Sequence, residues 1–349
     1  FRGAGRAGLK VVATGLLLVI LATAVSAVLW QTEVAAPGSM TARLGLSLNP
    51  AYRTGVGEQV AMVMGDADLA YVRVYQGTLP LLYPVRELGR WGIGPMLLLV
   101  VIVAVVLGCW WCLRRMGRWL GRRTTPGAVL LVLVLAWTVP MSLRLATLHV
   151  KYLRYFEPLM VPFAMLAAWW LMRLSDRWRR PIVSLTVAGT VLWGVMYLWA
   201  FAAPHPHRTA ALWLNEMVSP DQVVAFEHWD ETLALGANTR VDLPSYDLPD
   251  DEAKVRRWGE ALESADWAIL TSNRVRRTVL VNRDRFPRTG RLYKLLLTGE
   301  AGFEALARID RAPRLFGLIR PVQLADESFL NYDFPRVVVL RRVDEVDVD

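Results

Sequence analysis

Two basic side chains, Lys151 and Arg154, lie three residues apart in the string His-Val-Lys-Tyr-Leu-Arg-Tyr-Phe-Glu-Pro of residues 149–158. They could grip a phosphate or pyrophosphate group, because arginine offers a planar pair of donors and lysine a point charge. Tyr155, next to Arg154, belongs to the same candidate site. The alternative is ordinary anchoring of basic and aromatic residues at a membrane surface.

A second candidate follows an expected strand at residues 222–226 and reads Glu227-His228-Trp229-Asp230. Two carboxylates and an imidazole this close could contact substrate, hold a divalent ion or transfer protons. Residues 228 and 230 share one face of a strand while 227 points away, so binding by all three needs a turn. A purely structural role is the alternative, and we assign no metal ligand.

Other patterns carry weaker chemical signals. Asp66 and Asp68 form an Asp-x-Asp string that could hold Mg²⁺ or Mn²⁺ against a phosphate, although such strings are common by chance. Cys109 and Cys112 could do redox or metal chemistry, but the tryptophans between them favour packing against lipid. The cofactor therefore stays open, with a divalent cation as one candidate. The remaining polar candidates are His205, His207, Asp326, Glu327, Ser328, Tyr332 and Asp333.

The composition excludes several classes of protein. The chain has 349 residues, is 54% hydrophobic and contains 2 cysteines, which excludes intrinsic disorder and a disulfide-based scaffold. Residues 1–204 carry 20 Lys+Arg and 7 Asp+Glu, whereas residues 205–349 carry 20 and 24. The excess of positive charge therefore belongs to the first part alone. Because these cations lie between long apolar runs, they indicate a membrane protein rather than a nucleic-acid-binding one.

The apolar runs predict a polytopic α-helical membrane domain over residues 1–204. A spanning helix needs about 20 apolar residues, and the third and fourth runs are the shortest. The predicted spans are 11–30, 92–112, 127–143, 156–172 and 181–203.

The charges between these runs alternate in a way that predicts the direction of each span. Clusters of arginine and lysine precede the first run, separate the second from the third, and separate the fourth from the fifth. Cytoplasmic loops carry such an excess, so these segments belong inside. Residues 31–91, 144–155 and the whole tail from 204 then lie outside. We expect a multi-pass protein of the plasma membrane with an extracytoplasmic C-terminal domain.

The outer loop, residues 31–91, is too long to be a mere connection. Residues 50–65 are helix-like, and residues 71–78 alternate like a short strand. Its aromatic and polar side chains would form a wall for a substrate beside the membrane. The residues that we assign to this wall are Tyr75, Gln76 and Tyr83.

The tail, residues 205–349, predicts a small α/β domain. Helical patterns at 208–218, 250–264 and 288–297 alternate with strand patterns at 222–226, 266–271, 303–309 and 336–341. Such alternation favours a mostly parallel, Rossmann-like sheet. No Gly-x-Gly-x-x-Gly string follows a strand, so a dinucleotide site is not supported.

Several strings together resemble a known family. The string of residues 151–158 resembles the Arg-Tyr-x-x-Pro element of GT-C class membrane glycosyltransferases, which include relatives of the protein O-mannosyltransferases and aminoarabinose transferases. The likeness is closest to the bacterial family-39-like enzymes that use lipid-linked sugars, and it covers nearly the whole chain from about residue 45. The other strings lie at residues 76–84, 91–95, 213–215, 227–230, 270–274, 325–329 and 332–333.

The resemblance implies transfer of a sugar from a polyprenyl-phosphate carrier to a lipid, glycan or protein acceptor on the outer face of the membrane. It also implies that the catalytic aspartate lies in an earlier outer loop, upstream of Phe1. We therefore expect the chain to be a C-terminal part, and we assign no catalytic residue within it. The alternative is a non-enzymatic membrane protein whose extracytoplasmic α/β tail is a binding or assembly module. Neither hypothesis includes a nucleic acid as partner.

Overall fold

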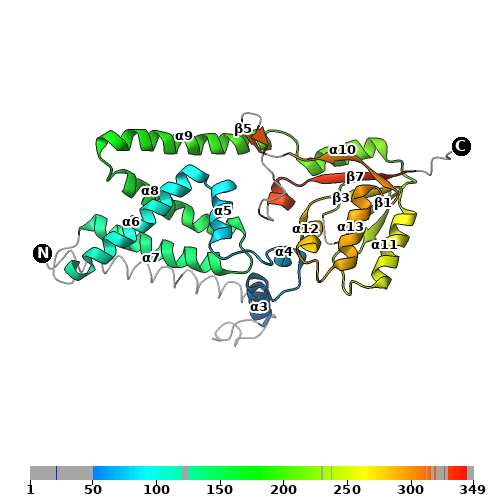
Figure 1. The fold of residues 1–349 in the computed structure, drawn as a ribbon, viewed down its shortest axis with the longest axis horizontal. Helices are drawn as coiled ribbons and strands as arrows, with labels where there is room; N and C mark the ends of the chain where they lie inside the picture. Colours follow the sequence, from blue (N-terminus) through cyan, green and yellow to red (C-terminus); the bar gives the residue numbers. More distant parts are fainter. Residues whose placement is uncertain are drawn as a thin grey trace, which may run out of the picture.

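Long helices form one end of the molecule in the computed structural model, and a mixed β-sheet with its own helices forms the other (Figure 1). The structure describes residues 21, 50–119, 125–228, 231–236, 238–311, 313–315, 318–319, 326 and 329–343. The predicted span 11–30 therefore lies outside the described residues except for Leu21, and residues 31–49 of the outer loop lie outside them too.

Three of the described helices are long and apolar enough to cross a membrane. The helices are α6 (Pro95–Trp119), α7 (Pro126–Thr147) and α9 (Asp176–Phe201). At about 1.5 Å per residue, each exceeds the roughly 30 Å of a bilayer core. They coincide with three predicted spans and extend past each of them at one end or both, because polar residues in the terminal turns end the apolar pattern without ending the helix.

The predicted span 156–172 is not one helix. A 3₁₀ helix, η1 (Leu153–Leu159), leads into α8 (Met160–Leu171), which has 12 residues. At about 1.5 Å per residue, α8 alone is too short to cross a bilayer core. Pro158 lies inside η1 and lacks the N–H that a continuous helix needs. α8 packs through Leu166 and Phe163 into the cores that it shares with α6 and α7.

The described part of the outer loop, residues 50–91, contains helices rather than a strand. α3 (Pro50–Met64) confirms the helix-like pattern at 50–65. The predicted strand at 71–78 is wrong, because the segment forms α4 (Ala70–Arg73) and following turns. Burial of Val72 and Tyr75, three residues apart, matches a helical turn instead of strand alternation. α5 (Leu82–Arg90) is amphipathic and runs crosswise to α9 in Figure 1.

The tail sheet has the strand order β2-β1-β3-β7-β4. The strands are β1 (Val223–Glu227), β2 (Thr239–Leu243), β3 (Trp267–Leu270), β4 (Phe303–Ile309) and β7 (Val337–Arg342). β1 and β3 are parallel, as predicted, and β2, which was not predicted, is parallel to β1. β7 is antiparallel to both of its neighbours. The sheet is therefore mixed, and Rossmann-like only in its parallel half. A separate two-stranded sheet pairs β5 (Arg314–Leu315) antiparallel with β6 (Leu318–Ile319).

Helices cover both faces of this sheet. α10 (Pro206–Met217) packs on one face, and α11 (Glu252–Ser264) and α13 (Pro287–Thr298) pack on the other. These three match predicted helices, and Gly299 ends α13 in the left-handed conformation with φ 88°. α12 (Arg274–Val281) and the short π-helix η3 (Phe329–Asp333) were not predicted.

The outer loop joins the two ends of the molecule. α4 lies between the long helices and α12 (Figure 1), and Ala70 is part of the tail core. Thr278 Oγ1 donates to the Ala70 carbonyl at 2.9 Å, and Asn282 Nδ2 donates to the Arg73 carbonyl at 3.2 Å. On the other side, Arg311 Nε donates to the Ala200 carbonyl of α9 at 2.8 Å. The tail therefore makes hydrogen bonds both to the outer loop and to the long helix α9.

Candidate functional site

Lys151 lies between α7 and η1 and is a buried cation without a carboxylate partner among the described residues. Its side chain is 3% exposed, and Nζ donates to Thr78 Oγ1 at 3.1 Å and to the His149 carbonyl at 3.0 Å. No Asp or Glu in the described part of the chain forms an ion pair with it. Burial lowers the pKa of the ammonium. An ammonium has three donors, and these two hydrogen bonds use two of them.

Four tyrosines form a wall beside Lys151, which we call the tyrosine wall (Tyr75, Tyr83, Tyr152 and Tyr155). Their rings meet edge to face, with centroids 5.7 Å apart for the pairs 83–75 and 75–152 and 5.4 Å apart for 152–155. This is the preferred geometry for aromatic pairs. The wall combines side chains from α5, η1 and the segments next to α4 and η1.

The tyrosine wall carries an exposed cation at each end. The Arg154 guanidinium lies 4.4 Å from the centroid of the Tyr152 ring, and that of Arg86 lies 5.1 Å from the centroid of the Tyr83 ring. Stacking on a ring holds a guanidinium without using its hydrogen-bond donors. The structure thus places the predicted site residues Tyr75, Tyr83, Lys151, Arg154 and Tyr155 in one cluster. Gln76 follows this cluster with an exposed side chain.

An apolar cavity of about 200 Å³ lies next to this cluster, between α5 and the membrane-type helices. The Leu81 amide donates to the Ala146 carbonyl at 3.4 Å, which brings the start of α5 against the end of α7 close to Lys151. The cavity has the size and polarity for part of a hydrocarbon chain. It is lined by Leu81, Pro84, Val85, Leu88, Leu98, Val101, Ile102, Val105, Val106, Ser142, Leu143, Ala146, Phe156 and Phe163.

Two buried carboxylates lie behind the tyrosine wall. Asp326 accepts hydrogen bonds from Tyr75 OH at 2.9 Å and from Tyr83 OH at 3.1 Å through the same oxygen, Oδ2. Glu87 accepts from Arg86 Nε at 2.7 Å through Oε1, while its Oε2 has no hydrogen-bond partner among the described residues. Both side chains are fully buried. Burial raises the pKa of Glu87 despite the opposing effect of Arg86.

The Glu87→Gln variant should unfold at a temperature a few degrees higher than the wild type at pH 7. Because the folded-state pKa of Glu87 is raised above its usual value, the folded protein binds a proton more readily than the unfolded chain. Ionised Glu87 therefore costs stability once the pH exceeds the unfolded pKa, and glutamine removes this cost. At pH 4 the difference should shrink.

Thermal unfolding at both pH values checks this prediction, with Glu58→Gln on the exposed face of α3 as the matched control. If Glu87→Gln were less stable than wild type by the same amount at pH 4 and pH 7, the prediction would be wrong. The hydrogen bonds of Glu87 would then contribute more stability than burial of its charge costs.

The tail candidates Glu227 and His228 form a separate polar group at the end of β1. The buried Glu227 carboxylate accepts a hydrogen bond from Tyr293 OH. His228 is exposed, and its Nδ1 lies 3.2 Å from Asp247 Oδ1. Asp230 lies outside the described residues. The two side chains thus have different partners within the tail. No group of three potential metal-binding side chains is found in the part of the chain that the structure describes.

Asp68 clamps the outer loop to the tail. Its Oδ1 accepts from Tyr246 OH at 3.0 Å and lies 3.5 Å from Arg73 Nε, and its Oδ2 pairs with Arg285. The bond to Arg285 is the main cause of the lowered pKa of this carboxyl. Because both oxygens are engaged by cations, the Asp66-x-Asp68 string does not form the cation site that its pattern suggested.

The remaining cysteine and histidine candidates take part in packing or hydrogen bonding within the fold. Cys109 and Cys112 are free thiols on α6. His207 Nε2 donates to the Thr271 carbonyl and His205 Nε2 to the Tyr332 carbonyl, each at 2.8 Å. These two bonds hold the start of α10, which follows α9, against the rest of the tail. Glu87 was missed by the sequence analysis. The sequence feature that could have indicated it is its position four residues after Tyr83 on a short amphipathic helix, which places both side chains on one helix face.

No protein-family model matches this chain, and no curated protein or solved structure matches it significantly.

Proposed function

We propose that this chain is part of a membrane glycosyltransferase that moves a sugar from a polyprenyl-phosphate carrier to a lipid, glycan or protein acceptor. The observation that carries the proposal is the buried ammonium of Lys151, which has no carboxylate partner among the described residues. The second element is the apolar cavity lined by Pro84 and Phe156, the chain neighbours of Tyr83 and Tyr155. A polyprenyl-phosphate sugar has both complementary parts, because its phosphate is an anion and its isoprenoid chain is a hydrocarbon.

The proposed roles follow from the position of each group. Part of the isoprenoid chain occupies the cavity between α5, α6 and α7. The phosphate lies against Lys151 and the exposed guanidinium of Arg154, and Tyr155, the half-buried member of the tyrosine wall, contacts the sugar. When the acceptor oxygen attacks the anomeric carbon, the bond from this carbon to the phosphate oxygen breaks and the phosphate leaves with the electron pair. The proton of the acceptor hydroxyl passes to a carboxylate base, which we do not assign within this chain. Cations placed at the phosphate oxygen stabilise the developing charge.

The distribution of charge supports a location of this site at the outer membrane surface. The arginines between α6 and α7 and those at the start of α9 belong on the cytoplasmic side by the positive-inside rule. The opposite ends of these helices, where Lys151 and α5 lie, then face outward together with the tail. The amphipathic α5, with exposed Leu82 and Val85, suits a helix lying in the headgroup layer.

The Arg154→Ala variant of the full-length protein should lose sugar transfer while its expression and folding persist. The Arg154 side chain is exposed, stacks on Tyr152 and makes no ion pair among the described residues, so its removal leaves the core intact. Transfer is measured in membranes supplied with radiolabelled polyprenyl-phosphate hexoses. The matched control is Arg208→Ala, which removes an exposed cation from α10.

Unchanged transfer by Arg154→Ala would remove the phosphate role of this residue. If the wild-type protein also transfers no sugar from any donor, the alternative hypothesis of a non-enzymatic membrane protein with a binding or assembly tail replaces the proposal.

A further inference from the structure

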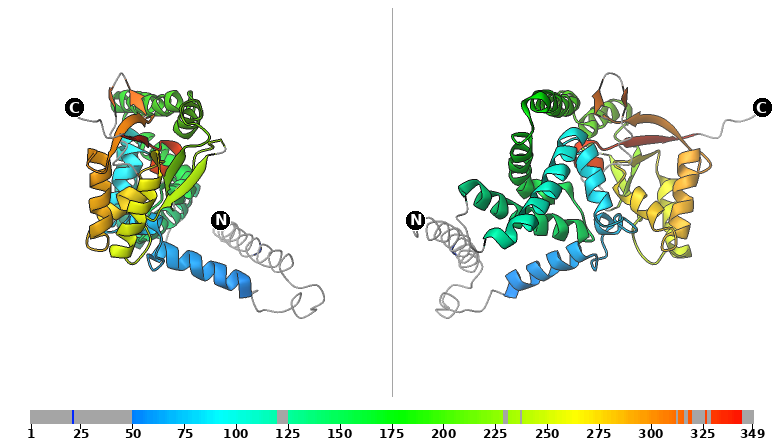
Figure 2. Two further views of the ribbon diagram at one scale, coloured as in Figure 1. Left: turned by 90° about the vertical axis from the view of Figure 1, so that its right-hand side faces the viewer. Right: turned by 60° about the vertical axis from the view of Figure 1, so that its left-hand side comes forward.

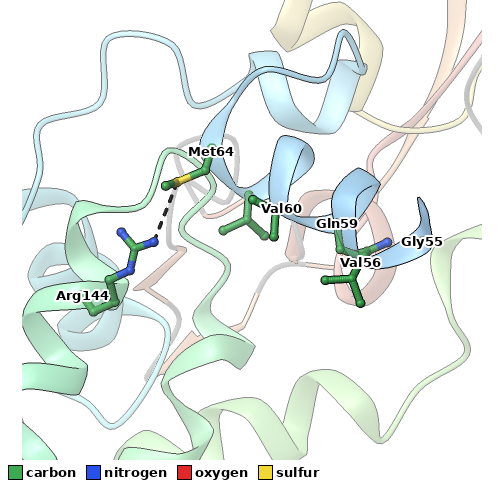
Figure 3. A pocket seen from close by; sticks show the side chains of 7 residues that line it. Gly55, Val56, Gln59, Val60, Met64 and Arg144 are labelled. Atoms are coloured by element: carbon green, nitrogen blue, oxygen red, sulfur yellow. Dashed lines mark hydrogen bonds between the residues drawn. The ribbon is translucent and has the colours of Figure 1, made fainter. Parts of the chain in front are cut away.

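A second apolar groove, of about 570 Å³, lies between α3 and the end of α7 (Figure 3). The side chains of α3 that line it are apolar apart from Gln59, and Val56, Val60 and Met64 are all exposed large hydrophobic residues. Figure 2 shows α3 extending away from the body of the molecule. An exposed apolar face of this kind marks a site for a membrane or a partner.

Arg144 is the one cation among the described residues that line this groove. It lies in the last turn of α7, and Figure 3 shows its side chain reaching across to Met64. Its only hydrogen-bond contact within the described part of the chain is from Nη2 to Met64 Sδ at 3.9 Å, and it forms no ion pair there. A sulfur acceptor is weak, so the guanidinium keeps nearly all of its hydrogen-bonding capacity.

The α3–α7 groove is distinct from the cavity beside Lys151. Leu143 and Ala146 line that cavity against α5, whereas Arg144 lines the groove against α3. The two sites therefore use different faces of the same helix. A ligand in the groove is not required to be the sugar donor, and its binding does not depend on the proposed function.

We infer that the α3–α7 groove binds an anionic glycerophospholipid, with an acyl chain along α3 and the phosphate on Arg144. Arg144 is exposed at the end of α7, where a long cationic side chain reaches the level of lipid headgroups, and a guanidinium matches a phosphate with two parallel donors. An uncharged apolar helix in the groove would cover Val56 and Val60 but would offer Arg144 no anion. A zwitterionic lipid offers the same chains with less net attraction for the cation.

Native mass spectrometry of the full chain tests this inference. The protein is released from nanodiscs that contain equal parts of phosphatidylglycerol and phosphatidylcholine with identical acyl chains. Wild type should retain phosphatidylglycerol preferentially, and Arg144→Gln should retain about tenfold less of it, because one charge-assisted contact is lost. Arg180→Gln, which removes an exposed arginine near the other end of the membrane helices, should behave like wild type. Equal retention of both lipids by wild type would overturn the inference.

A photo-reactive amino acid at Val60 identifies the occupant of the groove directly. Val60 is 55% exposed, so the replacement should not disturb packing. The expected product is an adduct with phosphatidylglycerol that disappears in the Arg144→Gln background. A cross-link from position 60 to residues 11–30 of the same chain, or to a second copy of the chain, would overturn the inference by showing that protein fills the groove. Val60→Trp should displace the lipid without changing any charge.

Discussion

The Lys151→Met variant should transfer sugar about 10²–10³-fold more slowly than wild type and remain folded, since removal of one preorganised group at a developing charge has an effect of this size. Methionine has nearly the length of lysine without its charge. In the wild type the ammonium is buried and has no carboxylate partner among the described residues. Such a charge costs stability, so its removal should not lower the unfolding temperature. If Lys151 were purely structural, the variant would transfer sugar at the wild-type rate and unfold at a lower temperature.

The measurement combines the transfer rate in membranes with thermal unfolding of the purified protein. Lys294→Met, at an exposed position on α13, is the matched control and should change neither quantity. Full transfer by Lys151→Met, or an unfolding temperature well below that of wild type together with lost transfer, would contradict the assigned role.

The Asp326→Ala variant should lose about 2–4 kcal/mol of stability, because two buried hydroxyl groups lose their common acceptor. These hydroxyls belong to Tyr75 and Tyr83, which lie 251 and 243 residues earlier in the chain. The same change should make the tail easier to cleave by protease, since Asp326 links it to the tyrosine wall. Burial holds the pKa of Tyr83 well above its usual value, so this hydroxyl stays a donor across the working pH range.

A double-mutant cycle separates this link from a general defect. Replacing both tyrosines by phenylalanine in the Asp326→Ala background should recover part of the lost stability, because no hydroxyl of this pair then lacks its acceptor. Asp284→Ala, at an exposed position of the tail, is the control. A cycle in which the three changes are simply additive would contradict direct coupling between Asp326 and the two tyrosines.

The helices of the membrane-type part follow from the sequence because their apolar runs are long. The runs behind α6, α7 and α9 leave little alternative to a helix of that length. The run at 156–172 is no shorter than the run 127–143 behind α7, so length alone did not decide its form, and Pro158 near its start breaks the α-helical pattern. The strand predicted at 71–78 failed because alternation over a few residues also fits a helical turn, which packing of Ala70 into the tail core favours.

The sequence predicts each strand of the five-stranded tail sheet except β2. Only one residue of β2, Leu243, is buried, so its pattern lacks the apolar residues that indicate a strand. The antiparallel β7 could not be distinguished from a parallel strand, because its run of consecutive buried residues fits either direction. Strand direction depends on the route of the connection, which the sequence pattern does not encode.

The candidate site was predictable in part. Aromatic and basic residues next to apolar runs singled out Tyr75, Tyr83, Lys151, Arg154 and Tyr155, and the structure brings them together. Their grouping with Asp326 depends on contacts across most of the chain, which no local pattern contains. Glu87 was hidden for a different reason, since an acidic residue on a short surface-type helix is normally exposed.

Binding of polyprenyl phosphate and of the matching polyprenol to the full chain in nanodiscs tests the central claim most directly. The two lipids share one hydrocarbon chain and differ only in the phosphate. If Lys151 and Arg154 form an anion site, the phosphate should bind at least about tenfold more tightly, and Lys151→Met should abolish this preference. Equal affinity of wild type for the two lipids would contradict the account, because the buried ammonium would then have no role in recognising the carrier.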